Sequence, residues 1–207
     1  MELGVADGIK SAIHEIRSKL DSGKAPVLVC IGGGSGSGKT SIVAKRISEA
    51  LGKSAMIIPM DDYFKGKKFV EDEVAKGREM NRDHPEYVDM EKLSEDLDLL
   101  KQNVGIQKPV FDYRESRRSG YVTVSPSRVI IIEGLFALHD SIGGMGDLRI
   151  FVAAGKEERL RRILKRKRHI RGTTSAEMLD YFHRVIDPMH VRYVEPTRKS
   201  ADIVIRN

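Results

Sequence analysis

The residues with the clearest chemistry form a glycine-rich loop near the start of the chain. Residues 33–40 read Gly-Gly-Ser-Gly-Ser-Gly-Lys-Thr and satisfy the P-loop pattern G-x-x-x-x-G-K-[ST]. The apolar run VLVCI at 27–31 precedes this loop, and an amphipathic stretch from Thr40 to Leu51 follows it. Glycines let backbone N–H groups turn inward around a phosphate, and the helix N-terminus adds the positive end of its dipole. The pattern therefore predicts a site for a nucleoside triphosphate.

Each residue of this loop has an expected role. Lys39 is expected to reach the β- and γ-phosphates, and the Thr40 hydroxyl is expected to bind Mg²⁺. The residues predicted to bind the nucleotide are Gly33, Gly34, Ser35, Gly36, Ser37, Gly38, Lys39 and Thr40. The dinucleotide pattern G-x-G-x-x-G is absent, which disfavours hydride chemistry. ATP and Mg²⁺ are thus the expected cofactors.

Carboxylates follow two of the predicted strands. Asp61 and Asp62 come after the apolar run AMIIPM at 55–60, and Glu133 lies at the end of VIIIEG at 129–134. Ligands of open α/β sheets bind at the carboxyl ends of the strands. One of the aspartates could take a proton from an attacking hydroxyl, and Glu133 could orient Mg²⁺. The alternatives are helix capping or solvation for the aspartates and an idle buried acid for Glu133.

A basic segment carries the positive charge of the chain. Eight of the 36 lysines and arginines lie between residues 159 and 171, and this segment holds no acidic residue. Its charge of +8 exceeds the formal net charge of the whole chain, which is +6. Arg162 and Arg166 are four residues apart and share one flank of the predicted helix 156–169, and Arg171 precedes a glycine. Such a helix could close as a lid over a triphosphate and stabilise the transferred charge. A solvated charged face is the alternative.

The alternation of strands and helical stretches predicts an α/β fold with a mostly parallel sheet. We expect one domain over 1–207 that contains an N-terminal helix within 1–25, a β-hairpin arm at 105–125 and a lid region at 156–175. Residues 63–89 are polar and predict loops and short helices near a ligand. Further helices are expected at 8–22, 90–100 and about 175–194, and further strands at 148–153 and 202–205.

Composition excludes several other classes of protein. Hydrophobic residues make up 40% and charged residues 32% of the 207 residues, as in a globular chain. A single cysteine excludes an intrachain disulfide framework and disfavours a structural zinc site. No apolar run approaches the roughly 20 residues that cross a bilayer. We therefore expect a cytoplasmic protein that does not bind membranes, and the local character of the basic segment disfavours general nucleic-acid binding.

A P-loop leaves three classes of nucleotide-binding protein open. A GTPase would need a guanine-reading N-K-x-D element, which the sequence lacks. A motor or clamp ATPase usually needs a larger chain and a Walker B strand that ends in Asp, whereas this strand ends in Glu133. A small-molecule kinase needs a base, an acceptor pocket and a cationic lid, and the sequence offers a candidate for each.

Taken together, the motifs resemble the uridine kinase and phosphoribulokinase family of P-loop kinases, most closely its uridine–cytidine kinase branch. The resemblance extends from about residue 26 to the end of the chain. The segments that carry it are GGSGSGKTS, DDYF at 61–64, NRDHPEYVD at 81–89, KPVFDY at 108–113, VIIIEG at 129–134, RLRRILKR at 159–166 with Arg171-Gly172, and EPTRKSADIVI at 195–205. The fold that this family implies is a P-loop NTPase three-layer sandwich with a five-stranded parallel sheet, a small β-hairpin arm and a basic helical lid.

The resemblance also implies roles for individual residues. Asp61 is implied as the general base for a ribose 5′-hydroxyl, Asp83 as a ligand of the ribose hydroxyls, and Glu133 with Thr40 as the Mg²⁺ site. The residues placed in catalysis are Asp61, Lys39, Arg166 and Arg171, and Arg162 is placed with the nucleotide. The residues placed with the acceptor are Asp83, His84, Phe111, Tyr113 and Ser116; for His84 an ordinary loop hydrogen bond is the alternative.

This sequence departs from the uridine–cytidine branch at three positions. Phe111 and Ser116 stand where the branch usually has a Tyr and a His that read the pyrimidine edge, and loss of such hydrogen bonds strongly affects specificity. The lid motif Arg-Gly-Arg is Arg-Gly-Thr here, ending at Thr173, and Lys167 or Arg168 are the candidates to compensate.

The sequence therefore predicts an ATP- and Mg²⁺-dependent kinase for a primary hydroxyl of a nucleoside, with uridine or cytidine as the first choice. One alternative is a kinase for a sugar, a sugar phosphate or another small alcohol on the same scaffold. The other is a nucleotide-binding regulatory or RNA-binding protein that uses residues 159–171 against phosphates. The expected partners are ATP and a small-molecule acceptor, without nucleic acid, and the sequence leaves a homo-oligomer open.

Overall fold

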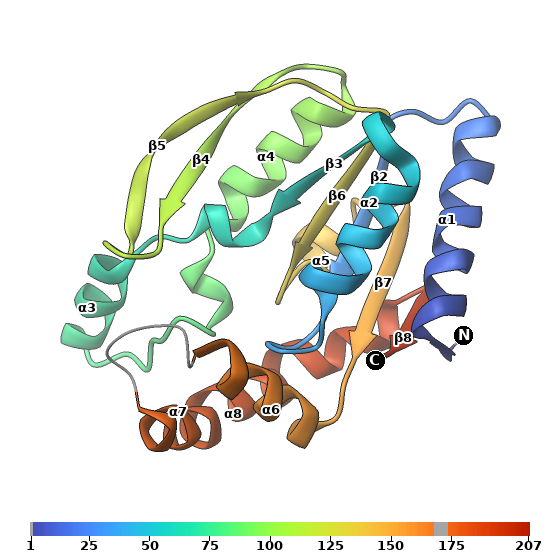
Figure 1. Ribbon diagram of the computed structural model, residues 1–207. Coiled ribbons are helices and arrows are strands. Elements are labelled where there is room, and N and C mark those ends of the chain that lie inside the picture. Colours follow the sequence, from blue (N-terminus) through green and yellow to red (C-terminus); the bar gives the residue numbers. More distant parts are fainter. Residues whose placement is uncertain (1, 168–173) are drawn as a thin grey trace.

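Six parallel strands form the central sheet of the molecule (Figure 1). The computed structural model describes residues 2–167 and 174–207. Across the sheet the strand order is β1-β8-β7-β2-β6-β3. The strands are β1 (Glu2–Gly4), β2 (Val27–Gly32), β3 (Ala55–Pro59), β6 (Val129–Gly134), β7 (Leu148–Ala153) and β8 (Ile203–Arg206). The predicted α/β class with a parallel sheet is confirmed.

Helices cover both faces of this sheet because its central strands are apolar on both sides. Val27, Val29 and Ile31 of β2 pack on one face against α1 (Val5–Asp21) and α2 (Lys45–Leu51). Leu28 and Cys30 point to the other face, which is covered by α4 (Met90–Lys101) and α5 (Asp140–Gly143). Successive residues of a strand point to opposite faces, so a continuous apolar run predicts burial between two helical layers. The result is the expected three-layer sandwich.

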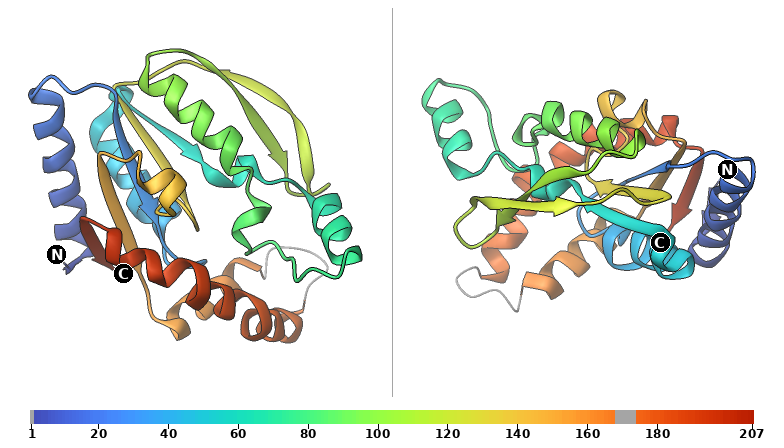
Figure 2. Two further views of the ribbon diagram at one scale, coloured as in Figure 1. Left: turned by 180° about the vertical axis from the view of Figure 1, so that it is seen from behind. Right: turned by 90° about the horizontal axis from the view of Figure 1, so that it is seen from above.

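The sheet has one strand more than the five that the family resemblance implies. Glu2, Leu3 and Gly4 form the edge strand β1, which pairs in parallel with residues 204–206 of β8. The two chain ends therefore lie side by side (Figures 1 and 2). Three residues with a single apolar side chain at the sheet edge carry no periodic signal, which is why the sequence analysis missed this strand.

The predicted hairpin arm is formed by β4 (Ile106–Asp112) and β5 (Arg117–Val124), which pair in antiparallel fashion. It lies outside α4 in Figure 1 and in the left view of Figure 2. The Arg118 guanidinium of β5 donates to the carbonyl oxygens of Tyr63 and Phe64, at 3.3 Å each, and to the Asp89 carboxylate at 2.7 Å. The arm is thus bonded to the segment that follows β3.

The lid region is helical on both sides of residues 168–173, which lie outside the described part of the chain. It consists of α6 (Lys156–Lys167) and a long helical stretch that begins with α7 (Ser175–Tyr181). That stretch continues as a π-helical segment (Phe182–Ile186), α8 (Asp187–Met189) and a second π-helical segment (His190–Val194). Ile163 of α6 packs with Met178 and Phe182 in a small apolar cluster, separate from the two clusters of the sheet.

The polar region 63–89 contains only short elements, as predicted. These are the end of a 3₁₀ turn (Met60–Tyr63), helix α3 (Lys67–Ala75) and a second 3₁₀ turn (Pro85–Tyr87). Another 3₁₀ segment (Glu195–Ser200) leads into β8. Within the described residues, no helix combines the length and the apolar character that crossing a membrane requires.

Candidate active site

The phosphate loop has a backbone conformation that requires glycine. Gly33, Gly36 and Gly38 have φ angles of 148°, 79° and 91°, which favour glycine over residues with a Cβ. A Cβ at Gly33 would lie 2.5 Å from the Val152 carbonyl oxygen, and one at Gly36 would lie 2.6 Å from the Arg159 carbonyl oxygen. The glycines therefore let the loop curl tightly against β7 and α6.

This curled loop fits a bound phosphate. It connects β2 directly to a helical turn that begins at Lys39, and the first N–H groups of a helix have no partner within the helix. The Ser37 hydroxyl is fully buried, and no described residue hydrogen-bonds to it. A buried polar atom without a partner is costly, so a ligand oxygen would satisfy it.

Thr40 and Glu133, the two residues predicted to bind Mg²⁺, meet at the base of the loop. The Thr40 hydroxyl donates to Glu133 Oε2 over 2.7 Å, and Glu133 is 5% exposed at the carboxyl end of β6. Hydroxyl and carboxylate oxygens are donors suited to Mg²⁺, which commonly takes one or two protein ligands and completes its shell with water and phosphate oxygens. Among the described residues there is no cluster of three or more potential metal ligands of the His, Cys, Asp and Glu types. The donor set here therefore fits a nucleotide-bound Mg²⁺.

Asp61 lies in the 3₁₀ turn that follows β3, and its neighbours anchor this turn. The buried Tyr63 donates its hydroxyl proton to Asp96 of α4 at 2.9 Å, and Asp62 pairs with Lys108 of β4. Burial raises the pKa of Asp61 to about 6. The carboxylates of Glu133 and Asp62 act in the same direction as burial, and the cations Lys39 and Arg166 oppose it. Asp61 therefore has the pKa of a group that can accept a proton near neutral pH.

Asp83 is the second acid with a raised pKa in the cleft. Burial raises the pKa of Asp83 to about 6, against the opposing charges of Lys39, Arg166 and Arg82. Lys39 and Arg166 thus act on both Asp61 and Asp83, which places the two acids around the same pair of cations. This agrees with a site that holds an acceptor next to the transferred phosphoryl group.

His84 is engaged in the protein through both of its ring nitrogens. Nδ1 accepts from the Glu86 backbone N–H at 3.2 Å, and Nε2 lies 3.1 Å from the Tyr193 hydroxyl. Burial lowers the pKa of His84. These contacts correspond to the alternative that the sequence left open, a loop hydrogen bond.

The three acceptor residues predicted on the hairpin differ in their exposure to solvent. Phe111 and Ser116 are each only 6% exposed, and the Phe111 ring packs edge-on against the rings of Phe64 and Tyr113. Tyr113 is 62% exposed. Desolvation of its hydroxyl and the nearby carboxylates, Asp61 first among them, raise the pKa of Tyr113. Tyr113 is therefore the hairpin side chain that lies near Asp61, Asp62 and Glu133.

The predicted lid cations also differ in their surroundings. Arg162 donates to the Ser37 carbonyl oxygen at 3.1 Å and to Glu158 at 2.5 Å, so it holds the backbone of the phosphate loop. Arg166 is exposed and has no carboxylate partner among the described residues. Arg171, like Arg168 and Thr173, lies outside the described residues.

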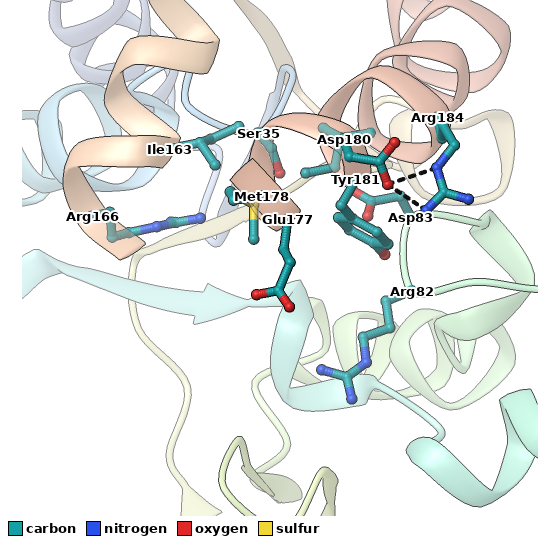
Figure 3. Close-up of a pocket in the computed structure, with 11 residues that line it drawn as sticks. Ser35, Arg82, Asp83, Ile163, Arg166, Glu177, Met178, Asp180, Tyr181 and Arg184 are labelled. Atoms are coloured by element: carbon teal, nitrogen blue, oxygen red, sulfur yellow. Dashed lines mark hydrogen bonds and ion pairs between the residues drawn. The ribbon is translucent and has the colours of Figure 1, made fainter. Parts of the chain in front are cut away.

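A cavity of about 630 Å³ opens between the phosphate loop, Asp83 and the lid helices (Figure 3). Its lining consists of Ser35, Arg82, Asp83, Ile163, Arg166, Glu177, Met178, Asp180, Tyr181, Arg184 and Ile186. In Figure 3, Arg166 and Arg82 lie on different elements at two sides of the opening, and the Tyr181 ring lies beside Asp83. This volume would accommodate a small acceptor.

Of the 11 lining residues, the sequence predicted only Ser35, Asp83 and Arg166 as site residues. Arg82 was passed over although it directly precedes Asp83, and that adjacency was the available signal. Tyr181 and Arg184 fall in the helix that the sequence predicts over about 175–194. A single sequence does not indicate which face of that helix lines a cavity. The burial of Tyr181 and the charge of Asp83 raise the pKa of Tyr181 to about 12, so its hydroxyl remains a hydrogen-bond donor.

Several known proteins are similar to this chain in sequence or in fold. The model described as the Phosphoribulokinase / Uridine kinase family matches residues 28–207. A uridine kinase from Geobacillus sp. (strain WCH70) is 38% identical over 186 residues, which cover 88% of this chain and 87% of that protein. A uridine kinase from Halalkalibacterium halodurans is 34% identical over 185 residues, with 88% and 87% covered.

A solved structure supports the fold. Phosphoribulokinase from Rhodobacter spheroides superposes with a TM-score of 0.68 at 18% identity, covering 88% of this chain and 70% of that one. At this level of identity the likeness concerns the fold alone.

Proposed function

This chain belongs to the phosphoribulokinase and uridine kinase family and is a phosphotransferase with an alcohol group as acceptor, and from that premise we propose that it is an ATP- and Mg²⁺-dependent kinase. The acceptor in this proposal is a primary hydroxyl of a ribose-containing compound. Uridine and cytidine are the first nucleosides to test, because curated relatives at 34–38% identity are uridine kinases. One observation carries the proposal: the same two cations, Lys39 of the phosphate loop and Arg166, act on both Asp61 and Asp83.

In this proposal Asp61 takes the proton of the attacking hydroxyl. The acceptor oxygen forms a bond to the γ-phosphorus of ATP, the bond from that phosphorus to the β–γ bridging oxygen breaks, and ADP leaves. A base with a pKa of about 6 is ionised at neutral pH and still basic enough to assist this transfer. The turn that carries Asp61 is held by the Tyr63–Asp96 hydrogen bond, which keeps the carboxylate in place.

Lys39 and Arg166 supply the positive charge around the transferred group. Both act on the pKa values of Asp61 and Asp83, so they lie where charge develops during transfer. Thr40 and Glu133 would hold Mg²⁺, which supplies neutralisation of the phosphate oxygens when it is bound. Arg162 contributes indirectly, because it fixes the carbonyl oxygen of Ser37.

A kinase for a sugar or sugar phosphate is a second candidate, and a specific observation favours it. Phe111 and Ser116, which stand where the uridine–cytidine branch reads its base, are each 6% exposed, and the Phe111 ring packs against Phe64. A side chain that is packed against protein offers little surface to a pyrimidine ring. The family scaffold would then act on an acceptor recognised elsewhere in the cleft.

The proposal is tested by ADP formation from Mg·ATP with nucleosides and sugars as acceptors, with Mg²⁺ removed by a chelator as the control. We expect turnover that requires an acceptor and stops without Mg²⁺. Binding of ATP without acceptor-dependent turnover, together with salt-sensitive binding of RNA, would favour a regulatory or RNA-binding protein instead.

A further inference from the structure

Arg82 is a cation in the acceptor cavity that the phosphoryl transfer does not use. It lines the cavity next to Asp83, and its side chain is exposed. None of the described residues forms an ion pair with it, and residues 168–173, Arg-His-Ile-Arg-Gly-Thr, contain no carboxylate that could do so. An arginine that reaches into a cavity without an acidic partner favours an anionic ligand.

Two acids of the cavity, Glu177 and Asp180, already have partners in the protein. Glu177 accepts from the backbone N–H and the hydroxyl of Thr174 at 2.8 and 2.9 Å, as part of the capping box of α7. Asp180 pairs with Arg184 four residues later, and their side chains are 54% and 74% exposed. An exposed pair of this kind contributes little stability, and in Figure 3 it lies on the far side of Tyr181 from the Arg82 guanidinium.

The place of Arg82 separates it from the transferred phosphoryl group. Ser35 and Arg166 line the side of the cavity next to the phosphate loop, whereas Arg82 lies at another edge, directly before Asp83 in the chain (Figure 3). Arg82 acts on Asp83, but Asp61 is influenced by Lys39 and Arg166 instead. A ligand bound through Asp83 would thus have its reacting hydroxyl toward Asp61 and its other end toward Arg82.

We propose that the acceptor carries an anionic group, a phosphate or a carboxylate, and that Arg82 binds this group at the end of the cavity remote from the reacting hydroxyl. This inference rests on the proposed kinase function and narrows its acceptor. The Tyr181 hydroxyl, which lines the same cavity, adds a neutral donor to this group. A guanidinium fork matches the oxygens of a phosphate or carboxylate, whereas a neutral sugar or base would leave Arg82 without a partner.

Matched pairs of acceptors test the inference through ADP formation from Mg·ATP. Uridine is compared with uridine 3′-phosphate, ribose with ribose 1-phosphate, and glycerol with glycerate, since each member of a pair keeps a primary hydroxyl. We expect the anionic member of at least one pair to have a kcat/KM at least about 10-fold above its neutral partner, from one charge-assisted contact. A preference for the anionic member in the first two pairs would identify a phosphate, and a preference in the third pair would identify a carboxylate.

Variants of Arg82 show whether this residue is responsible. Arg82→Gln should raise the KM of the preferred anionic acceptor about 10-fold or more, with smaller changes in its kcat and in the KM of ATP. Arg82→Lys should give an intermediate KM, because it keeps the charge and loses the fork. Arg128→Gln, an exposed arginine at the opposite end of β6 from Glu133, is the matched control and should change neither constant.

The outcomes separate the inference from the kinase proposal. The inference would be overturned if the protein phosphorylates uridine efficiently but not uridine 3′-phosphate, and if Arg82→Gln has no effect. The kinase proposal would still stand. An equal fall in kcat for neutral and charged acceptors in Arg82→Gln would also overturn it, because Arg82 would then bind the transferred phosphoryl group. Absence of turnover with every pair would overturn both.

Discussion

The imidazole of His190 lies directly against Gly34 of the phosphate loop. A Cβ at residue 34 would be 2.7 Å from His190 Nδ1 and 3.1 Å from the Cδ atom of Arg159. His190 is held from behind by Glu195, whose Oε2 lies 3.2 Å from Nε2, and Arg159 is held by Asp187 at 2.6 Å. Two side chains from the helical segments that follow β7 therefore support the loop from outside. His190 lies 156 positions after Gly34 in the chain.

Gly34→Ala is expected to weaken ATP binding because neither neighbour can move aside. Overpacking of a well-packed site costs about 1–3 kcal/mol, which corresponds to a dissociation constant for ATP raised by roughly 10-fold or more. Isothermal titration with Mg·ATP measures it. Gly155→Ala is the matched control, since a Cβ there meets no heavy atom within 4 Å. Equal affinities in the two variants would show that the contact does not constrain the loop.

The phosphate loop and the acids were predictable from the sequence because their signals are local. A run of eight residues specifies the loop, and Asp61 and Glu133 each follow an apolar strand, whose carboxyl end is where ligands bind in such sheets. The support of Gly34 by His190 and Arg159 has no such signal. It depends on how a helix far along the chain packs, and a single sequence does not specify that packing.

The acceptor cavity shows the same limit. Asp83 was found through the family resemblance, but Tyr181 and Arg184 were not, because the charge pattern of α7 and the segment after it also suits a solvated helix. The hairpin arm was predicted from its alternation, but the burial of Phe111 and Ser116 depends on contacts with Phe64 and with the start of α3. Element types are encoded locally, whereas the residues that line a cavity are set by tertiary packing.

The activity is expected to rise with pH below neutrality. Asp61 and Asp83 have pKa values raised to about 6, and both act as carboxylates in the proposed mechanism. Below pH 6 both acids bind protons, so kcat/KM should fall with a slope approaching two on a logarithmic scale, and it should level off above pH 7. Asp83→Asn should reduce the slope to one in whatever activity remains. A profile that stays flat down to pH 5 would contradict the raised pKa values.

Asp61→Asn is expected to stabilise the fold while it removes activity. The pKa of Asp61 is raised in the folded protein, so protonation of this acid favours the native state below its unfolded pKa of about 3.9, and that stability is lost as the pH rises through 6. At pH 8 the desolvated carboxylate therefore costs the fold on the order of 3 kcal/mol, which an amide avoids. Urea unfolding should show a gain for the variant at pH 8 and a much smaller one at pH 4. A loss of stability at pH 8 would contradict the burial of this charge.

Glu133→Gln is expected to change the Mg²⁺ requirement more than the affinity for ATP. Glu133 accepts a hydrogen bond from the Thr40 hydroxyl at 2.7 Å. Replacing Glu133 by Gln removes a charged oxygen ligand of the ion and weakens the orientation of the Thr40 hydroxyl. The Mg²⁺ concentration for half-maximal activity should rise by at least about 10-fold. Thr40→Ser, which keeps the hydroxyl, serves as the matched variant and should stay close to the parent protein. An unchanged Mg²⁺ dependence in Glu133→Gln would exclude this carboxylate from the metal site.

The most direct test of the account compares two neighbouring aspartates. Acceptor-dependent ADP formation is measured at pH 8 for Asp61→Asn and for Asp62→Asn, whose carboxylate pairs with Lys108 of the hairpin arm instead of facing the cations of the cleft. The account predicts that Asp61→Asn lowers turnover by at least about 100-fold with ATP affinity retained, and that Asp62→Asn changes turnover by less than about 10-fold. Full turnover in Asp61→Asn, or an equal loss in both variants, would contradict the assignment of Asp61 as the general base.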